Sequence, residues 1–206
     1  MPVSIPSVMN TDLSPRLQQA FRAFDDYNSR DTVHETFEGK DYAKEVLYAE
    51  RMTARLSAFA PDASEALQLA ARSQHIGRWE IPRSTYPMDR KGYLQWRNEL
   101  KAHHARVAAE ILTTCGYDIA VIDEVSFLLQ KKELHHNAGT QLLEDVICLV
   151  FIDHYLEAFA AGQDDAKVVD ILRKTLKKMS GRAIEEAGKI AVSSRIAALI
   201  GQAVTL

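Results

Sequence analysis

Apolar residues recur at every third or fourth position through most of the chain, the spacing that places them on one face of a helix. No segment alternates apolar and polar residues in the way that a half-buried strand does. The pattern therefore predicts an all-α protein, a single-domain helical bundle whose apolar faces pack together. The predicted helices cover residues 14–27, 41–59, 62–76, 90–115, 119–130 and 140–159, followed by two or three more within 164–204.

The two ends of the chain are predicted to differ. Residues 1–12 carry no continuous apolar stripe, and we expect them to form a flexible N-terminal arm. Residues 13–206 contain no internal repeat and no low-complexity linker, so they are predicted to form one helical domain. Within it, residues 164–204 form the C-terminal helices.

Composition and charge narrow the class of partner. Hydrophobic residues make up 47% of the chain and charged residues 26%, values typical of a globular protein. The formal net charge of −3 gives no general attraction to nucleic acid or to anionic membranes. Residues 1–10 lack the features of a signal peptide, and the apolar run 146–152 is too short to span a bilayer. We expect a soluble cytoplasmic protein that binds neither membranes nor nucleic acid; the sequence leaves the oligomeric state open.

The stretch AARSQHIGRWEIPRSTYPMDRK, residues 70–91, is the candidate site. Its two prolines interrupt helical structure, and long ordered loops usually carry function. It is also rich in arginine, whose planar fork suits phosphate and carboxylate groups. The alternative is that its cations are only solvated at the surface. The residues predicted to bind an anionic substrate are Arg78 and Arg83 in this loop, with Lys131 and Lys132 after the helix over 119–130.

Histidines and carboxylates face inward from several predicted helices. At about 100° per residue, His104 lies near the centre of the buried stripe of the helix over 90–115. His103 lies on the flank of that stripe, within reach of solvent. The other residues predicted to lie on or beside a buried stripe are Glu50, His75, Glu144 and Asp145.

Imidazole nitrogens and carboxylate oxygens of this kind suit a divalent metal ion, with Mn, Fe, Mg and Zn as the candidates. The alternative is that each group is a core histidine or a buried acid that a neighbour satisfies by a hydrogen bond. The residues alone leave both interpretations open.

Part of the chain resembles the HD-domain superfamily of metal-dependent phosphohydrolases, an all-helical fold. The resemblance rests on LQLAARSQHIGR, HHARVAAEILTTCGYD and LLEDVICLVFIDH, and gives an HD-like core over 48–160. It implies a metal-dependent enzyme. The metal ligands that it implies are His75, His103 or His104, and Asp145, with Glu144 as the alternative to Asp145.

The chain departs from the HD pattern at two positions. Ile76 stands where the family has the aspartate of its His-Asp doublet, and Glu50 stands where it has its first histidine. Either Glu50 and Glu144 compensate for the missing ligands, or the domain binds a ligand without catalysis. The whole chain also resembles a bacterial and plant family described only as a domain of unknown function, through ERMTARL, QHIGRWEIPRSTYPMDR and LEDVICLVFIDHYL.

Two functions follow as hypotheses. The first is a metal-dependent phosphohydrolase-like enzyme that acts on a small phosphorylated metabolite or nucleotide, in which Glu50 or Glu144 completes the metal shell or takes the proton. The second is a non-catalytic helical module that binds an anionic ligand or a protein partner through residues 77–91. The substrate and the identity of the metal are not predicted.

Overall fold

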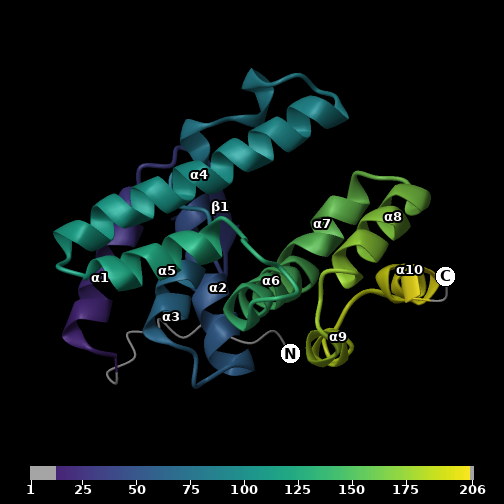
Figure 1. Ribbon diagram of the computed structural model, residues 1–206. Coiled ribbons are helices and arrows are strands. Elements are labelled where there is room, and N and C mark those ends of the chain that lie inside the picture. The colour runs from purple at the N-terminus through teal and green to yellow at the C-terminus, as the bar shows by residue number, and fades with distance from the viewer. Residues whose placement is uncertain (1–12, 205–206) are drawn as a thin grey trace. The chain divides into compact units, whose positions relative to one another are not determined.

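The computed structural model describes residues 13–204, so the predicted arm over residues 1–12 lies outside the described residues. The chain forms two compact units, the first ending at Lys132 and the second beginning at Glu133. The described part of the chain is mostly helical, with ten α-helices and one two-stranded hairpin (Figure 1). The prediction of a helical protein is therefore confirmed, with the hairpin as an exception.

The first unit carries five of these helices. Helices α2 and α5 both pack against α3, which also contacts α1, and α4 packs against α5 and α1 (Figure 1). Large side chains buried in this unit include Phe24, Met52 and Leu112. Its elements are α1 (Pro15–Asn28), β1 (His34–Phe37), β2 (Lys40–Ala43), α2 (Lys44–Phe59), α3 (Glu65–Arg72), α4 (Arg90–Thr114) and α5 (Ile119–Leu129).

The hairpin corrects the prediction that the protein contains no strands. Strands β1 and β2 pair antiparallel, with His34 opposite Ala43 and Phe37 opposite Lys40. Glu38 and Gly39, the two residues between them, both have positive φ, at 48° and 76°. Two such residues make the tight turn whose twist matches that of paired strands. Four-residue strands are too short to produce a recognisable alternation of apolar and polar residues, so the pattern missed them.

Side-chain caps explain where several helices begin. Asp89 accepts a hydrogen bond from the backbone N–H of Gly92 at 2.7 Å and is the N-cap of α4. Ser64 is the N-cap of α3 and accepts from the N–H of Leu67 at 3.2 Å, so this helix begins at Glu65 and not at residue 62 as predicted. Both caps satisfy N–H groups that have no partner within the helix.

The second unit begins with a long helical segment. This segment consists of α6 (Ala138–Val150), one π-helical turn (Phe151–Tyr155) and α7 (Leu156–Ala161). Three helices follow, of which α8 packs against α10 while α9 contacts α6 (Figure 1). None of the helices over residues 13–204 is long and apolar enough to cross a membrane. The three later helices are α8 (Asp165–Leu176), α9 (Gly181–Ala187) and α10 (Ser194–Val204).

Candidate functional site

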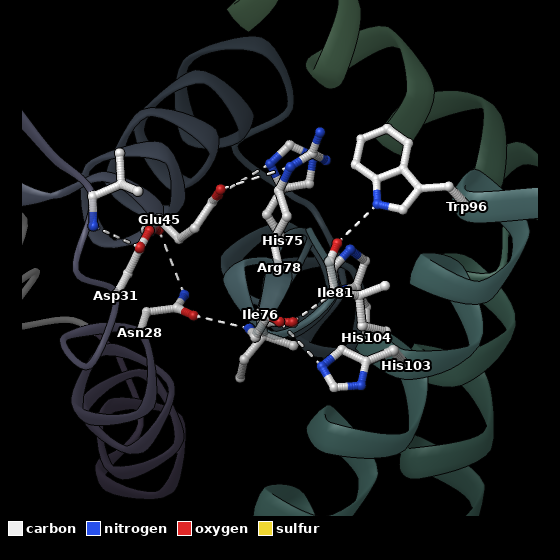
Figure 2. Close-up of polar contacts among 12 residues, drawn as sticks. Asn28, Asp31, Glu45, His75, Ile76, Arg78, Ile81, Trp96, His103 and His104 are labelled. Atoms are coloured by element: carbon white, nitrogen blue, oxygen red, sulfur yellow. Dashed lines mark hydrogen bonds and ion pairs between the residues drawn. The ribbon is translucent and has the colours of Figure 1, made fainter. Parts of the chain in front are cut away.

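The site is built on the turn that follows α3. The chain leaves α3 at Arg72 and reaches Gly77 in a left-handed conformation, with φ at 65°. A Cβ atom on Gly77 would lie 2.7 Å from Nε2 of His103, so only glycine fits this position without displacement. Asn28, from α1, accepts a hydrogen bond from the N–H of Gly77 at 3.2 Å (Figure 2). The turn is therefore held in one conformation by helices on either side of it.

Two neighbouring histidines of α4 hold the same turn. His104 donates from Nδ1 to the carbonyl of Ile76 at 2.6 Å, and His103 bonds through Nε2 to the carbonyl of Gly77 at 3.1 Å (Figure 2). The residues are 3% and 8% exposed. The inward position predicted for His104 is confirmed. His103 lies on the flank of α4 as predicted, but it is not within reach of solvent as expected, because the turn covers that flank.

His75 lies at the centre of the site, between a carboxylate and a guanidinium. Its Nδ1 is 3.2 Å from Oε2 of Glu45, and its Nε2 is 3.1 Å from Nη1 of Arg78 (Figure 2). An arginine can only donate hydrogen bonds, so Nε2 must accept and the ring proton of the neutral imidazole is on Nδ1. The ring stacks on Tyr48 with centroids 3.9 Å apart.

The surroundings of His75 keep its imidazole uncharged. Burial lowers the pKa of His75 well below its ordinary value of 6.5. Four cations lower it further, and they come from four places in the first unit: the start of α2, the turn after α3, the first third of α4 and the residues just after α5. These cations are Arg78, Arg97, Lys131 and Lys44.

Glu45 is the carboxylate of the site. Burial raises the pKa of Glu45 from 4.5 to about 7, although Arg78 and Lys44 act in the opposite direction. Its Oε1 is 3.7 Å from Nε of Arg78, and its buried Oε2 lies 3.2 Å from Nδ1 of His75 without the alignment of a hydrogen bond. At neutral pH the carboxyl group is therefore present in both its protonated and its ionised form.

Arg78 is half-buried and held from its other side by an aromatic ring. Its guanidinium carbon lies 5.0 Å from the ring centroid of Trp96. Trp96 is itself fixed, because its indole N–H donates to the carbonyl of Ile81 at 2.8 Å (Figure 2). The guanidinium thus lies among Glu45, His75 and Trp96 in a defined position.

Sequence reasoning missed Glu45 and chose Glu50 instead. Glu50 is half-buried on α2, where burial raises its pKa and the charged groups acting on it are Arg72, Asp25 and Lys40. Glu45 could have been found, because it precedes Ala49 by four positions and so extends the buried stripe of α2 by one turn. A carboxylate at such a position is the signal of a buried acid.

Arg83 and Lys132 are placed differently from Arg78. The guanidinium of Arg83 donates to three backbone carbonyls of its own loop, those of Tyr86, Pro87 and Asp89, at 3.0, 2.7 and 3.3 Å. It therefore stabilises the loop. Lys132 is exposed, with Nζ 6.0 Å from the ring centroid of Phe127. Their predicted contacts with a ligand stay predictions.

Glu144 and Asp145 belong to the second unit, and both are 3% exposed. Asp145 accepts hydrogen bonds from the N–H of Ser180 at 2.8 Å, from its hydroxyl at 2.6 Å and from the side chain of Gln141 at 3.0 Å. Glu144 lies 3.4 Å from Nζ of Lys178. These contacts join α6 to the start of α9 and explain why Asp145 can be buried.

The predicted metal centre is not seen among the described residues. Over residues 13–204, no group of three or more His, Cys, Asp or Glu side chains is arranged to hold a metal ion. At His75, the nitrogen with the free electron pair faces the cation Arg78, and two cations repel each other. A divalent metal therefore stays a prediction, which elemental analysis of protein purified without a histidine tag can test.

Comparison with known families identifies a relationship over most of the chain. The model of DUF4202, a domain of unknown function, matches residues 18–200. The chain belongs to this family. No curated protein and no solved structure matches it. The predicted relationship to a family of unknown function is thus confirmed, while nothing in these comparisons links the chain to the HD-domain superfamily.

Proposed function

We propose that the protein binds a small anionic ligand, of the phosphate type, at Arg78. The observation that supports this proposal is the incomplete neutralisation of its guanidinium. Among the described residues, Glu45 is the carboxylate paired with Arg78, at 3.7 Å, and the pKa of Glu45 is raised to about 7. A carboxyl group that is partly protonated at neutral pH cannot fully balance a charge that arginine always carries.

The other side chains of the site add to this excess of positive charge. His75 contributes no charge, because its pKa is well below 6.5, and the electrostatic influence of Lys44, Arg97 and Lys131 reaches its ring. Cations that face a partly buried position from several elements attract anions more strongly than the same cations in bulk water. Phosphate and sulfate oxygens match the fork of a guanidinium, which can donate two parallel hydrogen bonds.

We propose binding rather than metal-dependent hydrolysis, since the donors of the described residues do not assemble into a metal centre. The phosphohydrolase hypothesis and its HD-domain resemblance stay untested. The proposed function needs only the observed position of Arg78 beside the uncharged His75, and it requires no metal ion. It is therefore the simplest use of these contacts.

A thermal-shift titration with sodium sulfate tests the proposal. Sulfate stays a dianion across the neutral pH range, and sodium chloride at equal ionic strength serves as the control for general salt effects. Sulfate should raise the melting temperature of the wild type in proportion to the logarithm of its concentration once the site is nearly saturated. In Arg78→Gln the affinity should fall by about tenfold or more, since a bidentate charged contact is lost.

Two further variants make the result interpretable. Arg90→Ala removes an exposed cation at the start of α4 and should leave the sulfate affinity unchanged. Arg78→Lys keeps the charge but not the planar fork, so it should recover part of the affinity. An equal response to sulfate and chloride in the wild type, or undiminished sulfate binding in Arg78→Gln, would refute the proposal.

A further inference from the structure

The two ring nitrogens of His75 have different partners. Nδ1 carries the proton and lies 3.2 Å from Oε2 of Glu45, whereas Nε2 holds the free electron pair and lies 3.1 Å from Nη1 of Arg78 (Figure 2). The side chain of His75 is 20% exposed, so a small molecule can reach it from solvent. When the proton of a neutral imidazole faces a carboxylate, the opposite nitrogen can act as a base or as a nucleophile.

Arg78 has unused donors beside this electron pair. Its contacts among the described residues involve Nη1, Nε and the face of the guanidinium, which lies over the ring of Trp96. Nη2 takes part in none of these hydrogen bonds or ion pairs, and the side chain is 27% exposed. Nη1 carries two hydrogens, of which His75 accepts one. A phosphoryl group held by Nη1 and Nη2 would therefore lie next to Nε2 of His75, since both would be neighbours of the same guanidinium nitrogen.

We propose that His75 accepts a phosphoryl group on Nε2 from small acyl phosphates or phosphoramidates that bind at Arg78. The proposal rests on the proposed function and gives the site a reaction. The electron pair of Nε2 forms a bond to phosphorus while the bond from phosphorus to the leaving group breaks. That bond's electron pair leaves with the carboxylate of an acyl phosphate or with the ammonia of phosphoramidate. The ring keeps its Nδ1 proton and gains positive charge, which the ionised form of Glu45 balances across 3.2 Å.

The position of Glu45 limits the class of phosphoryl donor. Its carboxyl group lies on the Nδ1 side of the ring, away from the leaving group, so it cannot protonate that group. On the Nε2 side, the hydrogen-bonding partner among the described residues is Arg78, which keeps its protons at neutral pH. Leaving groups that need no proton are therefore favoured. The carboxylate of an acyl phosphate and the already protonated nitrogen of phosphoramidate meet this condition, whereas the alkoxide of an ordinary phosphate ester does not.

Incubation of the wild type with potassium phosphoramidate, and separately with acetyl phosphate, tests the proposal. Tandem mass spectrometry locates phosphohistidine, whose linkage is labile in acid and stable in alkali. His75 should be modified faster than His136, an exposed histidine that reports the background reactivity of imidazole. Sodium sulfate should slow the modification of His75 alone, because it occupies Arg78, with sodium chloride at equal ionic strength as the control. Glycerol phosphate should not modify His75.

Three variants separate the reaction from binding. In Arg78→Gln both the sulfate affinity and the rate of modification should fall by about tenfold or more. Glu45→Gln should slow the modification by about tenfold or more, because the charge on the ring loses its partner. Its sulfate affinity should rise, because Arg78 loses a competing carboxylate. Glu124→Gln, an exposed position on α5, is the matched control and should change neither quantity.

Preferential modification of His75 that sulfate slows supports the proposal. Modification of His75 no faster than that of His136, or unaffected by sulfate, would overturn it while leaving the proposed function intact. Equal losses of sulfate affinity and of rate in Glu45→Gln would show that Glu45 acts only on the fold, and would overturn its part in the reaction. Failure of sulfate to stabilise the wild type would instead remove the proposed function.

Discussion

Two buried carboxylates, one in each unit, have opposite surroundings. Asp145, on α6, accepts three hydrogen bonds from Ser180 and Gln141, at 2.6 to 3.0 Å. Glu45, on α2, is almost equally buried, at 4% against 3% exposed, but its Oε2 forms no aligned hydrogen bond and lies 3.2 Å from Nδ1 of His75. The carboxyl group of Glu45 contacts the uncharged ring of His75 and the charged guanidinium of Arg78. The guanidinium is 3.7 Å away.

The difference separates a structural acid from a candidate functional one. A buried polar group with all its partners stabilises one conformation and leaves no capacity for a ligand. A buried acid with an unsatisfied oxygen and a strongly raised pKa is unfavourable for stability, and such groups cluster at functional sites. Burial alone, which both carboxylates share, therefore says little about function; the state of the hydrogen bonds distinguishes them.

The largest predicted effect is at the satisfied carboxylate. Asp145→Asn replaces one acceptor oxygen by an NH₂ group, which cannot accept from Ser180. The N–H and the hydroxyl of Ser180 then compete for a single oxygen, and the start of α9 loses a charged partner. We expect a loss of about 3 kcal/mol in the free energy of unfolding, measured by urea denaturation. A loss below about 0.5 kcal/mol would show that these bonds do not stabilise the unit.

The two carboxylates also show how far the sequence could predict the site. Periodicity placed Asp145 and His104 inside correctly, because a position on a helix follows from spacing alone. Periodicity carries no information on which buried acid finds a partner, since Ser180 lies 35 residues from Asp145 in the sequence. For the same reason the burial of His103 was missed: the turn that covers it belongs to another segment, 26 residues away.

The second prediction compares His103 and His104, the two histidines of α4 that bond to the turn after α3. His104→Ala removes the donor to the buried carbonyl of Ile76 and should reduce the free energy of unfolding by about 2 kcal/mol. His103→Ala should reduce it by about 1 kcal/mol, because the other groups near that ring, Glu80 and Arg106, are exposed and can be hydrated. Urea denaturation of both variants measures the difference. A larger loss for His103→Ala would show that the turn depends on Gly77 more than on Ile76.

Helix boundaries were predicted better than contacts, for a physical reason that the hairpin makes clear. The start of α4 follows from one local hydrogen bond between Asp89 and Gly92, three residues apart. The hairpin requires pairing between His34 and Ala43. Its turn depends on a positive φ at Glu38, and glutamate rarely adopts this conformation, so the sequence does not indicate a turn there. Local rules therefore recovered the helices, whereas the site required contacts between segments far apart in the sequence.

The last and smallest effect concerns the unsatisfied carboxylate. The pKa of Glu45 is raised from 4.5 to about 7. Protonation of Glu45 therefore adds to the free energy of unfolding, fully below pH 4.5, and this contribution is lost as the pH rises through 7. Ionised Glu45 destabilises the folded protein by about 3 kcal/mol at most above pH 8, and its attraction to Arg78 is part of that balance. Glu45→Gln should therefore be more stable than the wild type by about 1 kcal/mol at pH 8, after the loss of attraction to Arg78.

This gain should disappear at pH 5, where Glu45 is protonated in the folded wild type and resembles the glutamine in charge. Urea denaturation of both proteins at pH 5, 6.5 and 8 measures the trend, and the difference between them cancels groups that titrate in both. Glu124→Gln, an exposed position on α5, is the matched control and should show no such trend. If Glu45→Gln is less stable at pH 8 than at pH 5 relative to the wild type, Glu45 is a satisfied structural acid like Asp145, and the contrast between the two carboxylates fails.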